Sequence, residues 1–180
     1  MASYYYLMAQ LPSILPHTDP PLSYSQFKEL ALRFLDQKDA SMLEQLALTP
    51  RKEAVSMRSA LLTQWYGFEH ALRLALEKMR AAKLKQEGAS KEAGVSSSFD
   101  VGSIVRAVSA IEDPLAAEQF LLQARLSVVE DLRRLHHFDS DAVFGYGLAL
   151  LLSERASKFK MESGRKEYHS IYTQILGEKI

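Results

Sequence analysis

Apolar residues recur along most of the chain with the three- and four-residue spacing of an α-helix, which predicts an all-α protein. The clearest signals lie between Asp113 and Arg155, where two helices are expected with a sharp break between them. Asp113 is a suitable N-cap, and Pro114 suits the first helical position, which needs no N–H bond. The second helix restarts at Asp139 or Ser140. We therefore predict a C-terminal helical hairpin within a helical bundle of about six to seven helices.

The region before the first clear helix is less regular. Residues 3–11 fit either a strand or a helix, because adjacent tyrosines favour strands while a short helix entering a bundle is equally possible. The prolines between Pro12 and Pro21 predict a loop. Ser23 and Gln26 then form a capping box, which marks the start of a helix with an apolar stripe. A further short helix is expected after Asp39.

The longest predicted helix spans about residues 50–86. Its apolar residues form a heptad seam. The seam comprises Leu61, Trp65, Phe68, Leu72, Ala75, Met79 and Ala82. Such a seam packs either against another helix of the same chain or against a second chain. We favour the intramolecular interpretation, because Leu or Ile does not occupy every position as in a strong coiled coil.

A polar segment of small residues, about 85–98, follows this helix and contains no aromatic residue. Such a segment cannot bury enough apolar surface to become ordered, so we predict a mobile linker between N-terminal and C-terminal halves. The chain is still expected to form a single helical domain over residues 1–180. Further helices are predicted at Val101–Ile111 and, near the C-terminus, at Glu162–Leu176.

Composition excludes several classes of protein. The 22 basic and 22 acidic residues balance, whereas bulk nucleic-acid binding requires a basic excess. The chain has no cysteine, which excludes disulfides and thiol chemistry. Its N-terminus lacks the basic region of a signal peptide. The apolar run from Ala142 to Leu152 is shorter than the ~20 residues of a membrane-spanning helix, so we interpret it as a buried core helix.

The residues that could bind a metal ion gather at the break in the hairpin. His136, His137, Asp139 and Asp141 are suitable in type. Adjacent histidines on a helix diverge by about 100°, so these two are not expected to share an ion. We interpret them as favourable cations at a helix C-terminus, followed by an aspartate cap. A metal-dependent hydrolase is therefore the weakest of the functions considered.

Other catalytic signals are missing from the sequence. There is no Gly-x-Ser-x-Gly nucleophile elbow and no glycine-rich phosphate loop. We therefore predict a protein that is not an enzyme, with no cofactor and no metal site. The segment from Arg51 to Glu92 has a mild basic bias, which fits a solvated helix face or an acidic protein partner.

The C-terminal half contains an ordered series of short motifs: Asp113-Pro114-Leu115, Glu118, Ala124-Arg125, Asp131-Leu132, His137-Phe138-Asp139 and Glu154-Arg155. This series resembles the C-terminal block of a short bacterial family. The family is encoded among V/A-type ATPase genes and looks like a divergent relative of the C-type subunit, which is the d-type subunit in eukaryotes. Leu126 and Ala156 depart from the family pattern, since aromatic residues are expected there, and the chain is shorter than a typical C-type subunit.

The resemblance implies a non-catalytic coupling or assembly subunit that joins the central stalk of the ATPase to its membrane rotor ring. The expected partners are central-stalk and rotor-ring subunits, and the expected location is cytoplasmic and peripheral at the inner face of the cell membrane. A stand-alone adaptor that dimerises through the Leu61–Ala82 seam is the alternative. The charged residues of the series are the candidates for partner contact: Arg125, Asp131, His137, Glu154 and Arg155.

Overall fold

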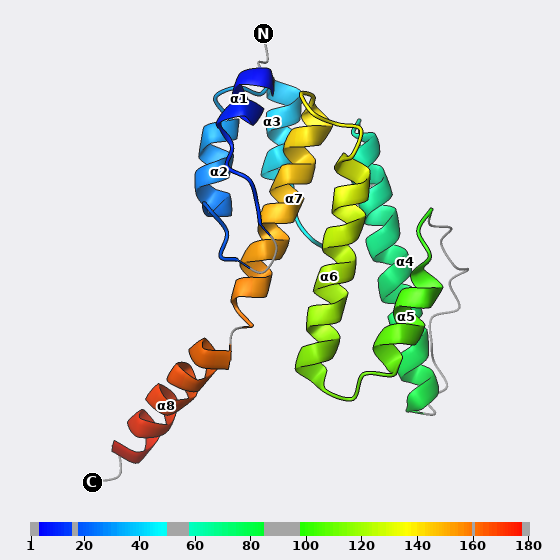
Figure 1. The fold of residues 1–180 in the computed structure, drawn as a ribbon, viewed down its shortest axis with the longest axis vertical. Helices are drawn as coiled ribbons and strands as arrows, with labels where there is room; N and C mark the ends of the chain where they lie inside the picture. Colours follow the sequence, from blue (N-terminus) through cyan, green and yellow to red (C-terminus); the bar gives the residue numbers. More distant parts are fainter. Residues whose placement is uncertain (1–3, 16–17, 50–57, 85–97, 160, 178–180) are drawn as a thin grey trace.

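The computed structural model describes residues 4–15, 18–49, 58–84, 98–159 and 161–177. Within these residues the chain forms eight α-helices, rather than the six to seven predicted, because the ambiguous N-terminal segment also forms a helix. It forms no strand in this part of the chain, which confirms the predicted all-α fold (Figure 1). The helices are α1 (Tyr4–Gln10), α2 (Tyr24–Ala31), α3 (Gln37–Glu44), α4 (Ala60–Lys83), α5 (Val101–Ser109), α6 (Pro114–Arg133), α7 (Ser140–Ser157) and α8 (Met161–Gly177).

Side-chain caps explain where most of these helices begin. An oxygen of each capping side chain accepts a hydrogen bond from a backbone N–H of the first turn, which has no partner within the helix. The capping box of Ser23 and Gln26 and the Asp113 and Asp139 caps form as predicted. The caps of α2 to α7 are Ser23, Asp36, Ser59, Asp100, Asp113 and Asp139.

Three sequence-based boundaries need correction or completion. The ambiguous N-terminal segment contains a helix, α1. The helix expected after Asp39 begins at Gln37, because Asp36 is its cap. The long helix begins at Ala60 rather than near residue 50, because Ser59 is extended and its hydroxyl accepts a hydrogen bond from the N–H of Leu62. Residues 50–57 and 85–97 lie outside the described residues, so the prediction of a mobile linker at about 85–98 stays almost wholly untested.

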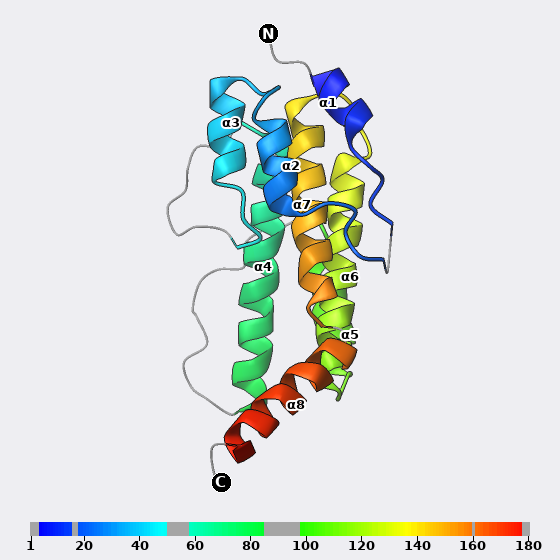
Figure 2. The ribbon, with the colours of Figure 1, turned by 90° about the vertical axis from the view of Figure 1, so that its left-hand side faces the viewer.

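Helix α7 lies at the centre of the bundle and contacts α1, α2, α3, α4 and α6. Figures 1 and 2 show α4, α5 and α6 on one side of it and α1, α2 and α3 on another. Every residue from Ala142 to Leu150 is buried, which confirms that the apolar run is a core helix. No helix in the described parts of the chain combines the length and the hydrophobicity needed to cross a bilayer.

Two glycines let neighbouring elements approach α7 closely. A Cβ atom at Gly145 would lie 2.3 Å from Cγ of Arg133, the last residue of α6. A Cβ atom at Gly147 would lie 2.8 Å from Cδ2 of Leu46, just after α3. Both distances are too short for carbon atoms that are not bonded. Any larger residue at either position would therefore force these side chains, or the segments that carry them, to shift.

The heptad seam of α4 faces the core of its own chain. Leu61, Trp65, Phe68 and Leu72 are fully buried, as the intramolecular interpretation predicts. The later seam residues are less enclosed, and Ala82 is exposed. A dimer formed through the whole seam would require α4 to leave its own core.

Candidate functional site

A cleft of about 290 Å³ lies between α4, α6 and α7, beside the segment that follows α3. Its apolar lining includes the buried side chains of Leu76, Leu121 and Leu152. The cleft also has four arginines and two glutamates, so its formal charge is +2. We call it the arginine cleft, after Arg73, Arg80, Arg125 and Arg155; the glutamates are Glu69 and Glu118.

Glu69 is the most buried charged group of the cleft, with a side chain that is 1% exposed. Its carboxylate accepts hydrogen bonds from Nε of Arg125 at 2.9 Å and from Nη2 of Arg125 at 3.1 Å. A third comes from Nε of Arg73 at 2.8 Å. Burying a carboxylate requires this kind of compensation, and the two guanidinium groups provide it for Glu69.

Sequence reasoning missed Glu69, although a signal for it exists. Leu62, Glu69 and Leu76 are spaced by seven residues, and all three are buried on α4. An acidic residue at one position of an otherwise apolar heptad line indicates either a polar network or a surface position. The partner Arg125 lies 56 residues away, on α6, so only the folded chain reveals which of these applies.

The outer part of the cleft is more open. Nε and Nη2 of Arg155 both donate to Oε1 of Glu118, at 3.0 and 2.7 Å, and link α7 to α6. The guanidinium of Arg155 also lies 5.8 Å from the ring centre of Phe159. Arg80 is exposed and has no ion-pair or hydrogen-bond partner among the residues that the structure describes.

The five residues predicted to contact partners are divided by the fold. Arg125 and Arg155 both line the arginine cleft. The carboxylate of Glu154 instead accepts a hydrogen bond from the backbone N–H of Tyr24 at 2.6 Å, which ties α7 to the start of α2. Asp131 and His137 lie near the turn between α6 and α7, where both are exposed.

Large apolar side chains are exposed at that same end of the bundle. Leu135 is 86% exposed, and the ring of Phe138 lies 4.9 Å from that of Tyr5 on α1. Tyr5 in turn contacts Tyr6 edge to face. We call this surface the aromatic end; it consists of Tyr5, Tyr6, Leu135 and Phe138.

A second apolar surface lies on α8, which Figures 1 and 2 place at the far end of the bundle from α1. The predicted apolar residues of this helix are all more than half exposed, and the rings of Tyr168 and Tyr172 stack with centres 6.0 Å apart. An amphipathic helix with an uncovered apolar face is typical of a surface for another protein. The face of α8 consists of Tyr168, Ile171, Tyr172 and Ile175.

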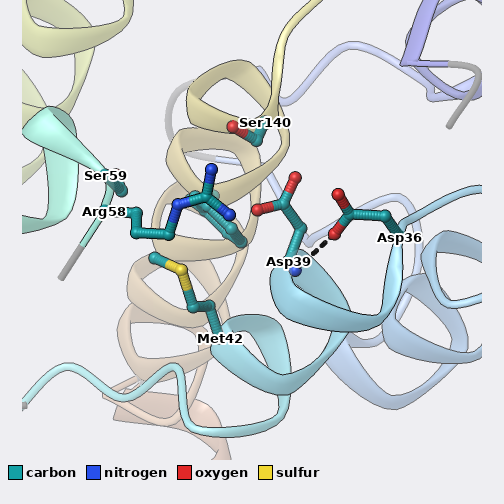
Figure 3. Close-up of a pocket in the computed structure, with 7 residues that line it drawn as sticks. Asp36, Asp39, Met42, Arg58, Ser59 and Ser140 are labelled. Carbon is teal, nitrogen blue, oxygen red and sulfur yellow. Dashed lines mark hydrogen bonds between the residues drawn. The ribbon is translucent and has the colours of Figure 1, made fainter.

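A smaller pocket of about 150 Å³ lies between α3, α7 and the start of α4. Figure 3 shows Asp39 and Arg58 pointing toward one another across it. Asp36 accepts a hydrogen bond from the N–H of Asp39 as the cap of α3, and the carboxylate of Asp39 accepts one from the hydroxyl of Tyr4. Burial and the nearby Asp39 raise the pKa of Tyr4. Both carboxylates thus have partners that hold the fold together.

His136 and the two aspartates of the hairpin break also serve the fold. Nδ1 of His136 lies 2.6 Å from Oδ2 of Asp139, while the other oxygen of Asp139 caps α7. Asp141 is buried and accepts a hydrogen bond from the backbone N–H of Leu61 at 3.2 Å, near the start of α4. Within the described part of the chain, no three His, Cys, Asp or Glu residues are grouped so that they could hold a metal ion.

Comparison with known proteins finds no matching protein family, no curated protein and no solved structure. The resemblance to a family related to the C-type subunit of V/A-type ATPases therefore stays a prediction that rests on the residues quoted for it.

Proposed function

We propose that this protein is a non-catalytic coupling or assembly subunit of a V/A-type ATPase, which joins the central stalk to the membrane rotor ring. The observation that carries the proposal is the position of two exposed apolar surfaces, one at the α1 end of the bundle and the other on α8, beyond its opposite end. The aromatic end and the face of α8 each have four large apolar residues. A body with a docking surface at each end is suited to holding two partners together.

The structure of the bundle fits a piece that passes force between partners. Tightly packed interiors deform little and transmit strain. Helix α7 contacts both α1 and α6, and α8 is the next helix along the chain. The body is expected to stay peripheral, at the cytoplasmic face of the membrane, through contacts with rotor-ring subunits.

The test is affinity capture of the tagged chain from native membranes, followed by identification of the captured proteins. Wild type should capture stalk and ring subunits. Leu135→Ser with Phe138→Ser should lose one group of subunits, and Ile171→Ser with Ile175→Ser should lose the other. Leu15→Ser is the matched control, because Leu15 is also exposed but lies outside both surfaces. Absence of every ATPase component from the wild-type eluate would overturn the proposal.

The alternative is a stand-alone adaptor that dimerises through the Leu61–Ala82 seam. Burial of Leu61, Trp65, Phe68 and Leu72 in the chain's own core argues against that interface. Light scattering of the purified chain separates the two proposals, because the adaptor must be a stable dimer and the coupling subunit is expected to be a monomer.

A further inference from the structure

The arginine cleft has more positive charge than its own carboxylates neutralise. Glu69 is shared between Arg73 and Arg125, and Glu118 is paired with Arg155. These groups and Arg80 together leave the cleft with a formal charge of +2. An electropositive cleft beside apolar walls attracts and orients an anionic ligand.

The donors that remain for a ligand are set well apart. Arg73 already donates through Nε to Glu69 and through Nη2 to the hydroxyl of Thr49 at 3.1 Å, so its remaining donors are on Nη1 and the second N–H of Nη2. Arg80 is seven residues further along α4, which separates the two Cα atoms by about 10 Å. A single inorganic oxyanion is too small to bridge that distance. Carboxylates two helical turns apart match it. In an extended chain, residues two and four apart share a face and lie about 7 and 13 Å apart, which brackets the distance between the two arginines.

The uncharged part of the cleft also suits a polypeptide. Its apolar lining gives the aliphatic stems of glutamate side chains a surface to pack on, as charged side chains commonly do. The balanced charge of the whole chain argues against a nucleic acid as the ligand.

We propose that the arginine cleft binds an acidic polypeptide segment of a partner protein, through carboxylates that contact Arg80, Arg73 and Arg155. This inference rests on the proposed role as a protein-contact subunit and adds the chemistry of one contact. Arg80 has no ion-pair or hydrogen-bond partner in the described ranges and can therefore contact a ligand, whereas Arg125 holds Glu69 in place and positions the wall of the cleft. Glu118 competes with the incoming carboxylates for Arg155.

Fluorescence anisotropy of a labelled hexaglutamate peptide, titrated with the full chain at low salt, tests the proposal. Arg80→Gln should weaken binding about twofold to fivefold, as expected for one partly exposed charge pair. Glu118→Gln should strengthen binding by a similar factor, because it removes a negative charge and frees the donors of Arg155. Arg33→Gln is the charge-matched control, since Arg33 is exposed and pairs only with its neighbour Glu29 on the described surface.

The opposite signs make the test decisive, because a purely structural role would not make Glu118→Gln bind more tightly. Absence of peptide binding would overturn the proposal, and so would equal weakening by Arg33→Gln and Arg80→Gln. Displacement of the peptide by inorganic phosphate at constant ionic strength would overturn it in favour of a small-oxyanion site. Because the assay uses the isolated chain, its failure would leave the capture of ATPase components as a separate result.

Discussion

Replacing Glu69 by glutamine should strongly destabilise the bundle, although the two side chains have the same shape. The carboxylate is 1% exposed and accepts three hydrogen bonds from Arg73 and Arg125. Glutamine keeps one acceptor oxygen but turns an amide N–H₂ group toward the remaining arginine donors. The substitution also leaves the guanidinium of Arg125, which is only 13% exposed, without its counter-charge.

The size of the effect follows from how well water can replace the lost partner. Removing one member of a fully buried ion pair costs about 3–5 kcal/mol. Arg73 is 45% exposed and can regain water, so its share is small. Arg125 is mostly buried and can regain little water. We therefore expect Glu69→Gln to lower the free energy of unfolding by about 3 kcal/mol, a large part of the roughly 5–15 kcal/mol that a domain has.

Urea unfolding followed by far-ultraviolet circular dichroism measures this loss. Glu29→Gln is the control, because the exposed Glu29–Arg33 pair should contribute less than about 0.5 kcal/mol. The double variant Glu69→Gln with Arg125→Met should recover much of the stability, since no buried charge then lacks a partner. A loss below about 1 kcal/mol for Glu69→Gln, or additive losses in the double variant, would refute the reasoning.

Three further outcomes are expected. Gly147→Ala should lower the free energy of unfolding by about 1–3 kcal/mol, because the new Cβ would lie 2.8 Å from a methyl carbon of Leu46. Gly67→Ala should raise it by about 0.5–1 kcal/mol, since nothing lies within 4 Å of that Cβ. Urea unfolding of the two variants measures the difference. Burial raises the pKa of Tyr146 from 10.0 to about 12 in the folded protein. The contribution of this hydroxyl to folding stability is therefore complete below pH 10 and is lost as the pH rises toward 12. Tyr146→Phe, which loses a hydrogen bond to Pro12, should therefore be less stable than wild type near neutral pH, and the difference should shrink at about pH 11. Asp113→Ala should lower the stability by about 1 kcal/mol through loss of the α6 cap, and an unchanged urea midpoint would contradict that role.

Features with a local cause are predictable from the sequence. The caps at Ser23, Asp113 and Asp139 act on backbone groups two or three residues away, so the residue pattern alone identifies them. The predicted start of α4 near residue 50 is wrong, because more than one local start signal is present. Thr49 and residue 50 form a plausible start, but the cap that forms in the fold is Ser59.

The arginine cleft is not predictable from the sequence, because its parts come from distant segments. Arg125 and Glu69 are 56 residues apart, and Arg155 and Glu118 are 37 residues apart. Each residue alone resembles an ordinary charged position on a helix. Only the packing of α4, α6 and α7 shows that these charges share one cleft. The apolar face of α8 is predictable, whereas its exposure is not, because periodicity does not say what covers a face.

The central position of α7 has a consequence for how the protein is made. A nascent chain synthesised as far as Arg133 contains the apolar faces of α2, α4 and α6, but it lacks α7, the helix against which these faces pack. At about 10 residues per second, roughly ten seconds pass between synthesis of the start of α4 and completion of α7. During that interval the nascent chain is a natural client for a chaperone, and a chain interrupted before Asp139 should be degraded rather than accumulate.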